Sequence, residues 1–441
     1  MNLENLKNIY FIGIGGIGMS ALARYFLFHG KNVAGYDRTV TSLTEKLMEE
    51  GADIHYQDKI DSIPKTFKNK ENTLVVYTPA IPSNHTEFLF FQKNHFNLKK
   101  RAEVLGLITQ SYKGLCIAGT HGKTTTSTIL AHLLHQSHIG CNAFLGGIAK
   151  NYNTNLLLSK TSPYTVIEAD EYDRSFHWLS PYIAIITSVE ADHLDIYGSE
   201  KKYVESFQKF TSLIQPKGVL LLKEGLSISP KVSKGVKIHT YSITKGDYYA
   251  ENITIDKGEI IFDFITPKGR IEKIQLGVPI AINIENSIAA MAIAMLIGVN
   301  AEEIKKGIKS YKGVDRRFDF QIKTPNLIFL NDYAHHPAEV KQSILSIKQL
   351  YPTKKITGVF QPHLYSRTQS FYKEFAESLS LLDKVILLDI YPAREKPIEG
   401  VSSQLIYDAL SPTMEKKLVK KESLLEVIKR EPIEILITLG A

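Results

Sequence analysis

The sequence predicts an α/β protein of three domains, each built around a mostly parallel sheet. Two glycine-rich loops, near residues 13 and 119, each follow a short apolar run and precede a helix-compatible stretch. Beyond residue 313, apolar runs that end in polar clusters alternate with helix-compatible segments. Strand, loop and helix in this repeated order are typical of doubly wound sheets, which bind ligands at the carboxyl ends of their strands.

The composition is that of an ordinary soluble globular protein, with 44% apolar and 22% charged residues over 441 positions. The net charge of +7 is spread along the chain, so we expect no nucleic acid partner. Cys116 and Cys141 have neither paired nor metal-type spacing, and no signal peptide or membrane-length apolar run stands out. We expect a cytoplasmic protein without a membrane span, as a monomer or a weak homodimer.

The first segment, residues 1–107, carries a dinucleotide-type fingerprint. An apolar run at 9–12 precedes three glycines that match G-x-G-x-x-G: Gly13, Gly15 and Gly18. Asp37 ends the next expected strand, 33–36, at about the distance where an acidic residue contacts a ribose. This pattern predicts a Rossmann-like domain that binds a diphosphate and a ribose. Close packing of helix on strand is the alternative use of the glycines.

The expected strand 73–77 ends in a loop that contains Thr78 and Ala80. Ligands of open α/β sheets bind beyond the carboxyl ends of strands, so this loop is a candidate contact for the same ligand. An ordinary proline-stiffened turn explains the loop equally well.

The second segment, residues 108–312, begins with a phosphate-binding loop after the apolar run 115–118. Its members are Gly119, Thr120, His121, Gly122, Lys123, Thr124 and Thr125. A common P-loop has a glycine where this chain has Ile117, so the loop is short. Lys123 is expected on the outer phosphates of a nucleotide, and the Thr124 hydroxyl on Mg²⁺. This predicts a P-loop ATPase-type domain.

Two later apolar runs of this segment, 164–167 and 182–189, both end in acidic residues. Carboxylates and a histidine at neighbouring strand ends can hold Mg²⁺, which takes few protein ligands and keeps several waters. Glu168 and His193 are therefore the predicted metal ligands. Three more carboxylates are held in reserve, and we expect some of them to be exposed loop residues: Asp170, Glu171 and Asp192.

Between residues 246 and 276, short β-prone runs separated by glycine turns predict a small antiparallel part of the central domain. Asn283 and Asn286 open an alanine-rich helical run, 287–297. Three residues apart, they share a helix face and can both face a ligand. For Asn283 on its own, capping of the helix is the favoured interpretation.

The third segment, residues 313–441, contains four expected strands that end in polar clusters: 327–330, 356–360, 385–388 and 433–438. They predict a second Rossmann-like sheet, although no glycine fingerprint indicates a dinucleotide. Arg316 and Arg317 open the segment. Together with its histidines they predict a lid that carries cationic groups toward an anionic centre, and interdomain salt bridges are the alternative.

With these residues in place, the chain resembles the Mur ligases, ATP-dependent enzymes that form amide bonds in peptidoglycan precursors. The short GTHGKTT loop is the most specific match, and further stretches match in order over nearly the whole chain. They are 12–21, 168–172, 332–338, 360–364, 366–368 and 389–394.

The resemblance implies ATP and Mg²⁺ as cofactors, with UDP-N-acetylmuramate and L-alanine as substrates. It places the UDP-sugar, rather than NAD, in the first domain, with residues 15–20 on the diphosphate. The implied sugar-nucleotide contacts are Gly13, Gly15, Gly16, Gly18, Met19, Ser20, Asp37, Thr78 and Ala80.

For the phosphoryl-transfer centre, the resemblance implies Lys123 on ATP, Thr124 and Glu168 on one magnesium ion, and His193 on a second. Further residues near the ATP are Asn283, Asn286 and one arginine of the pair Arg316 and Arg317. The residues implied to face the amino acid and the reaction centre are Asp332, Tyr333, His336, His363 and Arg367.

The chain departs from the family pattern at three places. Ile282 stands where members usually carry a histidine, and Leu364 stands where they carry an arginine, which leaves Arg367 as the expected anchor of a carboxylate. Members continue past Leu439 with a glycine–aspartate turn and a closing helix. We therefore expect an end that is either cut short or shortened.

The implied reaction phosphorylates the muramoyl carboxylate, releases ADP and lets the amine of L-alanine attack the acyl phosphate, with His336 or His363 taking a proton. One alternative joins a recycled tripeptide to the same sugar. An NAD-dependent oxidoreductase would rest on residues 13–37 and leaves the second loop unexplained. A nucleotide-sensing regulator is the non-catalytic alternative.

Overall fold

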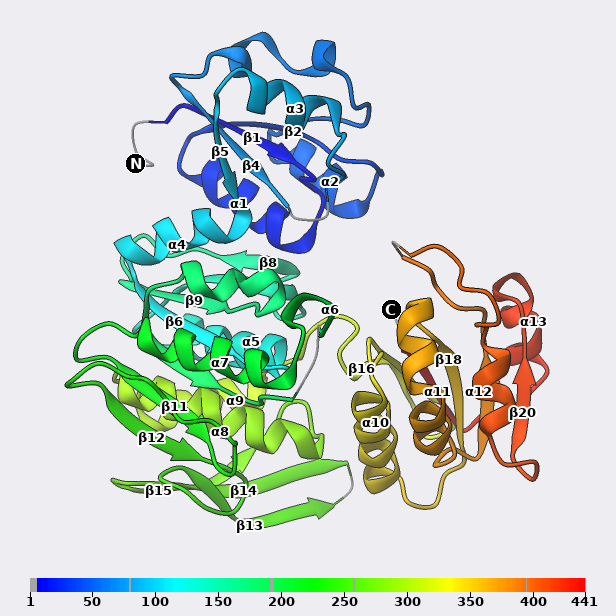
Figure 1. Ribbon diagram of the computed structural model, residues 1–441. Helices are drawn as coiled ribbons and strands as arrows, with labels where there is room; N and C mark the ends of the chain where they lie inside the picture. Colours follow the sequence, from blue (N-terminus) through cyan, green and yellow to red (C-terminus); the bar gives the residue numbers. More distant parts are fainter. Residues whose placement is uncertain (1–5, 79–80, 191–193, 257, 394, 441) are drawn as a thin grey trace. The chain divides into compact units, whose positions relative to one another are not determined.

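The computed structural model describes residues 6–78, 81–190, 194–256, 258–393 and 395–440 (Figure 1). The chain divides into two compact units. The first comprises Met1–Glu251, Asp263–Ile274 and Glu285–Tyr311. The second comprises Asn252–Phe262, Gln275–Ile284 and Lys312–Ala441. Helices and strands alternate through most of both units, which confirms the predicted α/β class.

The first sheet has five parallel strands in the order β3-β2-β1-β4-β5. Ile9 and Phe11 of β1 face one apolar layer, and Tyr10 and Ile12 face another. Burial on both faces explains why β1 is a continuous apolar run. The elements are β1 (Asn8–Ile12), α1 (Ile17–Phe28), β2 (Asn32–Tyr36), α2 (Ser42–Glu49), β3 (Asp53–His55), η2 (Ile60–Ser62), η3 (Lys65–Lys68), β4 (Thr73–Tyr77), α3 (Thr86–Lys93), β5 (Asn97–Lys100) and α4 (Arg101–Ser111).

The second sheet has seven strands in the order β12-β11-β10-β6-β9-β7-β8, and only the β7–β8 pair is antiparallel. The strand before the phosphate loop, β6, lies between β9 and β10, so the two predicted acidic strand ends flank the loop. The elements are β6 (Lys113–Ala118), α5 (Lys123–Gln136), β7 (Asn142–Ala149), β8 (Thr154–Leu157), β9 (Tyr164–Glu168), η4 (Tyr172–Trp178), β10 (Pro181–Ile186), α6 (Leu194–Tyr197), α7 (Glu200–Ser212), β11 (Val219–Lys223) and β12 (Lys237–Tyr241).

A small sheet pairs its strands in chain order, β13 (Tyr249–Asp256), β14 (Glu259–Thr266) and β15 (Gly269–Gln275). The two-residue connection between β14 and β15 permits only an antiparallel hairpin, as predicted. Helix α8 (Ala281–Leu296) follows, then α9 (Ala301–Ser310). The favoured interpretation of Asn283 as a helix cap is wrong, because α8 begins two residues earlier and the Asn283 N–H already donates to Ile280 O at 2.9 Å.

The third large sheet has the order β16-β17-β21-β18-β19-β20, with β16 antiparallel at one edge. The last strand, β21, lies between β17 and β18 in parallel register, which the predicted strand 433–438 anticipates. The edge strands β16 and β20 were not predicted. The elements are β16 (Asp319–Lys323), β17 (Ile328–Asp332), α10 (Pro337–Leu350), β18 (Ile356–Gln361), α11 (Tyr365–Leu379), β19 (Lys384–Leu387), α12 (Gln404–Ala409), β20 (Glu415–Leu418), η5 (Lys421–Ser423), α13 (Leu424–Lys429) and β21 (Ile435–Gly440).

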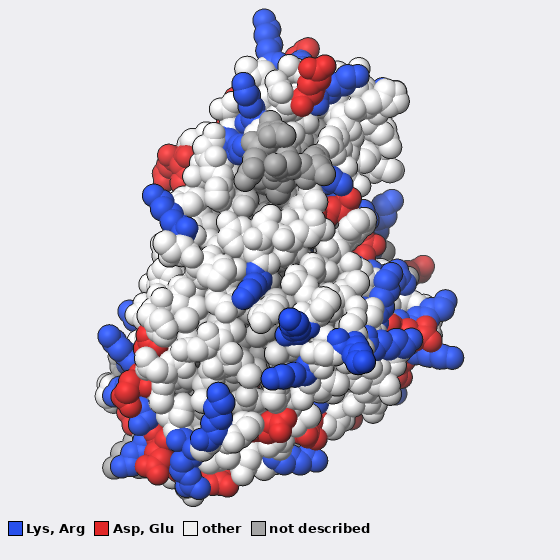
Figure 2. Space-filling model, turned by 90° about the vertical axis from the view of Figure 1, so that its left-hand side faces the viewer, with Lys and Arg blue, Asp and Glu red and all other residues white. Residues whose placement is uncertain are grey.

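On the face shown in Figure 2, basic side chains lie singly or in small groups with neutral surface between them. This distribution agrees with the scattered lysines of the sequence. Within the described ranges, no helix is long and apolar enough to cross a membrane.

Candidate active site

The phosphate loop connects the buried strand β6 to helix α5 and needs glycine at two positions. Gly119 and Gly122 have φ of +145° and +82°, backbone conformations that other residues rarely adopt. A Cβ atom on Gly119 would lie 2.1 Å from the Thr187 hydroxyl, and one on Gly122 would lie 3.0 Å from Oδ1 of Asn286. The two glycines therefore let the loop pass close to its neighbours and enter the helix with its N–H groups at the loop.

Two hydroxyl residues at the end of β10 hold this loop in place. Ser188 Oγ accepts a hydrogen bond from the His121 N–H at 2.7 Å, and the Thr187 hydroxyl donates to His121 O at 2.5 Å. Thr120 is held from the same side, with its hydroxyl 2.7 Å from Glu190 O. Sequence reasoning missed Thr187 and Ser188. Their position just after a strand beside β6 is the signal that could have identified them.

Lys123 lies under its own loop. Its ammonium donates to Gly119 O at 2.6 Å and to Thr120 O at 3.2 Å, and lies 2.8 Å from Oε2 of Glu171. Burial lowers the pKa of Lys123, but the negative charges of Glu171, Glu168 and Asp170 outweigh it and leave the pKa raised. Lys123 is therefore a firmly charged ammonium, and Glu171, a reserve metal ligand in the sequence, is its ion-pair partner.

Thr124 and Glu168, two of the implied metal ligands, lie close together beside this lysine. The Thr124 hydroxyl is 3.0 Å from Oε1 of Glu168. A Cβ atom on Gly146 would lie 2.1 Å from Oε2 of Glu168, so the glycine in β7 makes room for the carboxylate. One carboxylate and one hydroxyl at a phosphate loop fit Mg²⁺, which completes its shell with phosphate oxygens and water. The predicted ligand His193 and the reserve Asp192 lie outside the described residues.

The loop after β1 has the geometry expected of the fingerprint. Gly13 has φ of +88°, and a Cβ atom there would lie 2.9 Å from Cγ2 of Thr78, so the loops after β1 and β4 are in contact. The Gly15 N–H donates to Oδ2 of Asp37 at 2.7 Å. Asp37 therefore holds the glycine loop. Ala80 lies outside the described residues.

Helix α1 is fixed to the neighbouring sheet by Asn155 of β8. Ser20 is fully buried, donates to Ile17 O at 2.9 Å and accepts from Nδ2 of Asn155 at 3.0 Å. Oδ1 of Asn155 also accepts from Arg24 at 2.8 Å. The Ser20 side chain thus joins helix α1 to strand β8, whereas Met19 lines the cavity described next.

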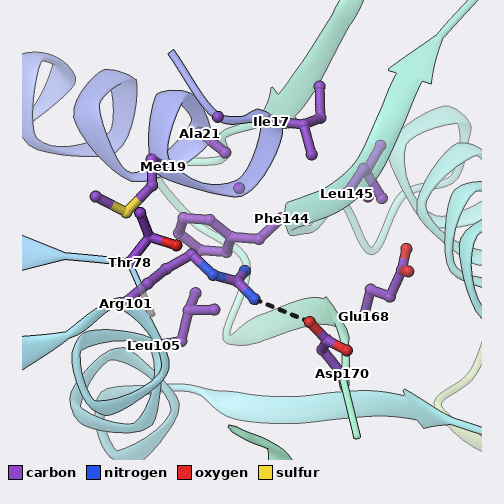
Figure 3. Close-up of a pocket in the computed structure, with 13 residues that line it drawn as sticks. Ile17, Met19, Ala21, Thr78, Arg101, Leu105, Phe144, Leu145, Glu168 and Asp170 are labelled. Atoms are coloured by element: carbon purple, nitrogen blue, oxygen red, sulfur yellow. Dashed lines mark hydrogen bonds and ion pairs between the residues drawn. The ribbon is translucent and has the colours of Figure 1, made fainter. Parts of the chain in front are cut away.

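A cavity of about 300 Å³ is lined by residues of the glycine loop and by the Glu168 carboxylate (Figure 3). Figure 3 shows Thr78 on one side of it and Glu168 and Asp170 on the other, and Gly16 and Gly18 also line it. Arg101 reaches into it from the first turn of α4, 3.5 Å from Oδ2 of Asp170. The remaining lining is mainly apolar: Ile17, Met19, Ala21, Leu105, Phe144, Leu145 and Gly146. The cavity thus reaches from the glycine loop to the Glu168 carboxylate, which contacts Thr124 at the start of α5.

The two asparagines of α8 have different surroundings. Asn286 accepts a hydrogen bond from the Thr126 hydroxyl at 3.2 Å, on the first turns of α5. Its amide therefore lies next to the phosphate loop. Asn283 donates through Nδ2 to Val278 O at 3.2 Å.

In the second unit, the ring of Tyr333 contacts both arginines that the sequence predicts for the site. The guanidinium carbons of Arg316 and Arg317 lie 4.9 and 5.2 Å from the centre of its ring, within cation–π distance. The Tyr333 N–H donates to Arg316 O at 2.7 Å. Asp332 is buried and accepts from the Ser343 hydroxyl; burial raises its pKa, against the opposing effect of Arg317.

A second group in this unit surrounds His363. Nη1 of Arg367 lies 3.1 Å from Nδ1 of His363, whose ring stacks on Tyr391 at 5.8 Å. His335, which sequence reasoning did not select, packs its ring 5.6 Å from His363. Leu364, at the departure from the family pattern, has φ of +73°, a strained conformation for leucine directly between His363 and helix α11. His336, in contrast, packs on Phe371 at 5.2 Å.

Comparison with known proteins finds three family models that match this chain in sequence. "Mur ligase family, catalytic domain" matches residues 8–113, "Mur ligase middle domain" matches 117–294, and "Mur ligase, glutamate ligase domain" matches 316–434.

Among curated proteins, the UDP-N-acetylmuramate--L-alanine ligase of Phocaeicola vulgatus is 63% identical over 441 residues, covering 100% of this chain and 96% of that protein. The protein of the same name from Parabacteroides distasonis is 58% identical over 442 residues, with the same coverage. Among solved structures, the UDP-N-acetylmuramate-alanine ligase of Thermotoga maritima matches with a TM-score of 0.83 and 27% identity, over 98% of this chain and 95% of that one.

Proposed function

This chain belongs to the Mur ligase family, and we propose that it joins L-alanine to the carboxylate of UDP-N-acetylmuramate in peptidoglycan precursor synthesis. ATP supplies the energy and is converted to ADP and phosphate. We assign the sugar nucleotide to residues 1–107, ATP to residues 108–312 and the amino acid to residues 313–441. The enzyme is proposed to be cytoplasmic, and its state as a monomer or a weak homodimer stays a prediction.

The observation that carries this proposal is the shared cavity. A sugar nucleotide with its diphosphate at Gly16 and Gly18 extends its lactyl carboxylate toward Glu168. Glu168 contacts Thr124, which follows Lys123 at the start of α5. Acceptor carboxylate and ATP γ-phosphate can therefore meet without either ligand leaving its own loop, which is the proximity that phosphoryl transfer needs.

The first step forms a bond between a carboxylate oxygen and the γ-phosphorus while the bond to ADP breaks. We propose that ATP binding turns Lys123 from its loop carbonyls toward the phosphates before this step, and that Asn286 supports the loop. Magnesium, held by Thr124 and Glu168, neutralises charge on the phosphate oxygens when bound. A second ion at His193 remains a proposal from the family resemblance.

In the second step the amine of L-alanine attacks the acyl carbon, and phosphate leaves. We propose that Arg367 binds the carboxylate of L-alanine, and that His363 or His336 takes a proton from its ammonium. Asp332 and Tyr333 position this group, and Arg316 or Arg317 contacts the ATP phosphates. The mainly apolar lining of the cavity slows hydrolysis of the acyl phosphate because it offers water few hydrogen-bond partners.

The test is ADP release with UDP-N-acetylmuramate and each of L-alanine, glycine, L-serine and the L-alanyl-γ-D-glutamyl-meso-diaminopimelate tripeptide. We expect turnover to be fastest with L-alanine and to require the sugar nucleotide. Turnover with the tripeptide and none with L-alanine would assign the chain to the peptide-recycling reaction. NADH binding without UDP-sugar binding would favour an oxidoreductase, and full activity of Lys123→Ala would favour a regulator.

A further inference from the structure

Arg101 is a cavity residue that the sequence motifs do not identify. It follows β5, an outer strand of the first sheet, and begins helix α4. Among the described residues that line the cavity it is the only cation, whereas Glu168 and Asp170 are acidic. Figure 3 shows its guanidinium next to Phe144 and directed toward Asp170. An arginine in this position offers a planar set of donors to a phosphate or a carboxylate.

The contact between Arg101 and Gly18 gives the third fingerprint glycine a specific role. A Cβ atom on Gly18 would lie 2.6 Å from Nη1 of Arg101 and 3.1 Å from its Cδ and Cζ atoms. The nearest neighbours of that position are thus the arginine side chain and not another backbone segment. In dinucleotide folds this glycine usually serves close packing of helix on strand. Here the missing side chain of Gly18 leaves room for the guanidinium of Arg101 beside the glycine loop, where we propose that the diphosphate binds.

The partner of Arg101 in the structure is easily replaced. The ion pair with Asp170 is long, at 3.5 Å, and the two side chains are 24% and 39% exposed. Pairs of this kind contribute little to stability. A doubly charged diphosphate in the same cavity is the stronger partner for a guanidinium. Asp170 thus orients Arg101 without binding it firmly.

We propose that Arg101 binds the diphosphate of the sugar nucleotide, exchanging its ion pair with Asp170 for the phosphate oxygens. This inference rests on the proposed function and adds a residue to its substrate site. The guanidinium lies against Gly18, at the diphosphate end of the cavity. The guanidinium also lies 3.5 Å from Asp170, on the side of Glu168, so the choice of the diphosphate over the lactyl carboxylate rests on the contact with Gly18 of the glycine loop.

The test measures binding of UDP, UDP-N-acetylmuramate and uridine by calorimetry to the intact protein and to Arg101→Ala, Arg101→Lys and Asp170→Asn. Lys99→Ala is the matched control, because it removes the same charge nearby but pairs with Glu103 within its own segment at 3.2 Å. We expect Arg101→Ala to weaken the binding of UDP and of UDP-N-acetylmuramate equally, by about 10- to 100-fold, and to leave the binding of uridine unchanged. Arg101→Lys should retain part of the affinity for UDP. Asp170→Asn should increase the affinity for UDP severalfold, because it removes the carboxylate that pairs with Arg101.

Unchanged UDP binding by Arg101→Ala overturns the proposal, and so does a loss confined to UDP-N-acetylmuramate, which would place the lactyl carboxylate on Arg101. An equal loss of UDP affinity in Lys99→Ala would mean that net charge alone explains the effect, and would also overturn the proposal. Thermal melting of each variant shows whether it is folded. If Arg101→Ala does not fold, the UDP affinity of Arg101→Lys tests the proposal in its place. If the unaltered protein binds neither UDP nor UDP-N-acetylmuramate, the proposed function itself fails.

Discussion

The ammonium of Lys123 lies 2.8 Å from Oε2 of Glu171 and 2.6 Å from the carbonyl oxygen of Gly119 in its own loop. The lysine that we propose to contact the γ-phosphate is thus already mostly buried, charged and anchored at the loop. In this proposal, ATP binding exchanges these partners for phosphate oxygens. The exchange makes Lys123 and Glu171 a coupled pair, and variants of each should differ in what they change.

Lys123→Met is expected to lower kcat by about 100- to 1,000-fold, because it removes a cation that contacts the transferring phosphoryl group. Binding of the sugar nucleotide, which uses other residues, should be unchanged. Steady-state ADP release and UDP-N-acetylmuramate titration measure the two effects. Equal loss of sugar binding would mean that the variant damages the fold instead.

Glu171→Gln should release Lys123 from its carboxylate while keeping the shape of the side chain. Burial raises the pKa of Glu171 to about 7, against the opposing charge of Lys123. We expect the dependence of kcat/KM for ATP on pH to change between about pH 6 and 8, where this group titrates. If the pH profiles of kcat/KM for the two proteins superimpose, Glu171 does not influence the binding or reaction of ATP.

Thr187→Val removes the hydroxyl that donates to His121 O while preserving the branched shape. The phosphate loop should lose its fixed conformation, and the KM for ATP should rise about 10-fold. Thr187→Ser is the matched control, since it retains the hydroxyl, and should stay close to the unaltered protein. A similar KM in both variants would show that this hydrogen bond does not order the loop.

Arg367→Ala should raise the KM for L-alanine about 10- to 100-fold, because a charged hydrogen-bonding partner of the amino acid carboxylate is lost. The KM values for ATP and the sugar nucleotide should change little. Initial rates at varied L-alanine measure the effect. A loss of kcat at unchanged KM would move Arg367 from substrate binding to the chemical step.

Glu87, in the first sheet domain, is expected to give stability a distinct pH dependence. It is fully buried and accepts from the Tyr10 hydroxyl at 2.7 Å, and burial raises its pKa from 4.5 to about 7. The folded chain therefore binds more protons than the unfolded chain between these values. The contribution of Glu87 to stability is full below about pH 4.5 and is lost as the pH rises through about 7.

Glu87→Gln should remove this dependence, with a difference of up to about 3 kcal/mol between the two proteins developing from pH 5 to pH 8. Urea unfolding at several pH values measures it. Comparing the two proteins cancels the opposite contribution of His85, whose pKa burial lowers, whereas His55 lies 3.3 Å from Glu87 and its contribution changes with the substitution. Parallel curves would mean that Glu87 is ionised in the folded chain.

Much of the fold and part of the site could be predicted because they depend on local patterns. The phosphate loop, the fingerprint glycines and Glu168 all follow apolar strand runs, so their places at the strand ends were predictable. The predicted start of α8 was wrong because an alanine-rich pattern alone does not show that the helix begins at Ala281. The edge strands β16 and β20 carry too few apolar residues to stand out as strands.

The missed site residues depend on contacts between distant parts of the chain. Arg101 meets Asp170, 69 residues away, and Thr187 meets His121, 66 residues away. No spacing pattern connects such pairs. The only local signal is that each follows a strand of a parallel sheet, at the edge where ligands bind. A polar residue after a strand is common, so this signal becomes specific only when the strand order is known.

The proposed mechanism transfers the γ-phosphate of ATP to the sugar carboxylate before L-alanine attacks. The direct measurement uses UDP-N-acetylmuramate labelled with ¹⁸O in both carboxylate oxygens, with ATP and L-alanine, and mass spectrometry of the released phosphate. We expect one ¹⁸O atom in each phosphate, because a carboxylate oxygen bonds to the γ-phosphorus and leaves with it. Unlabelled phosphate, with the displaced labelled oxygen recovered as water, would exclude this transfer.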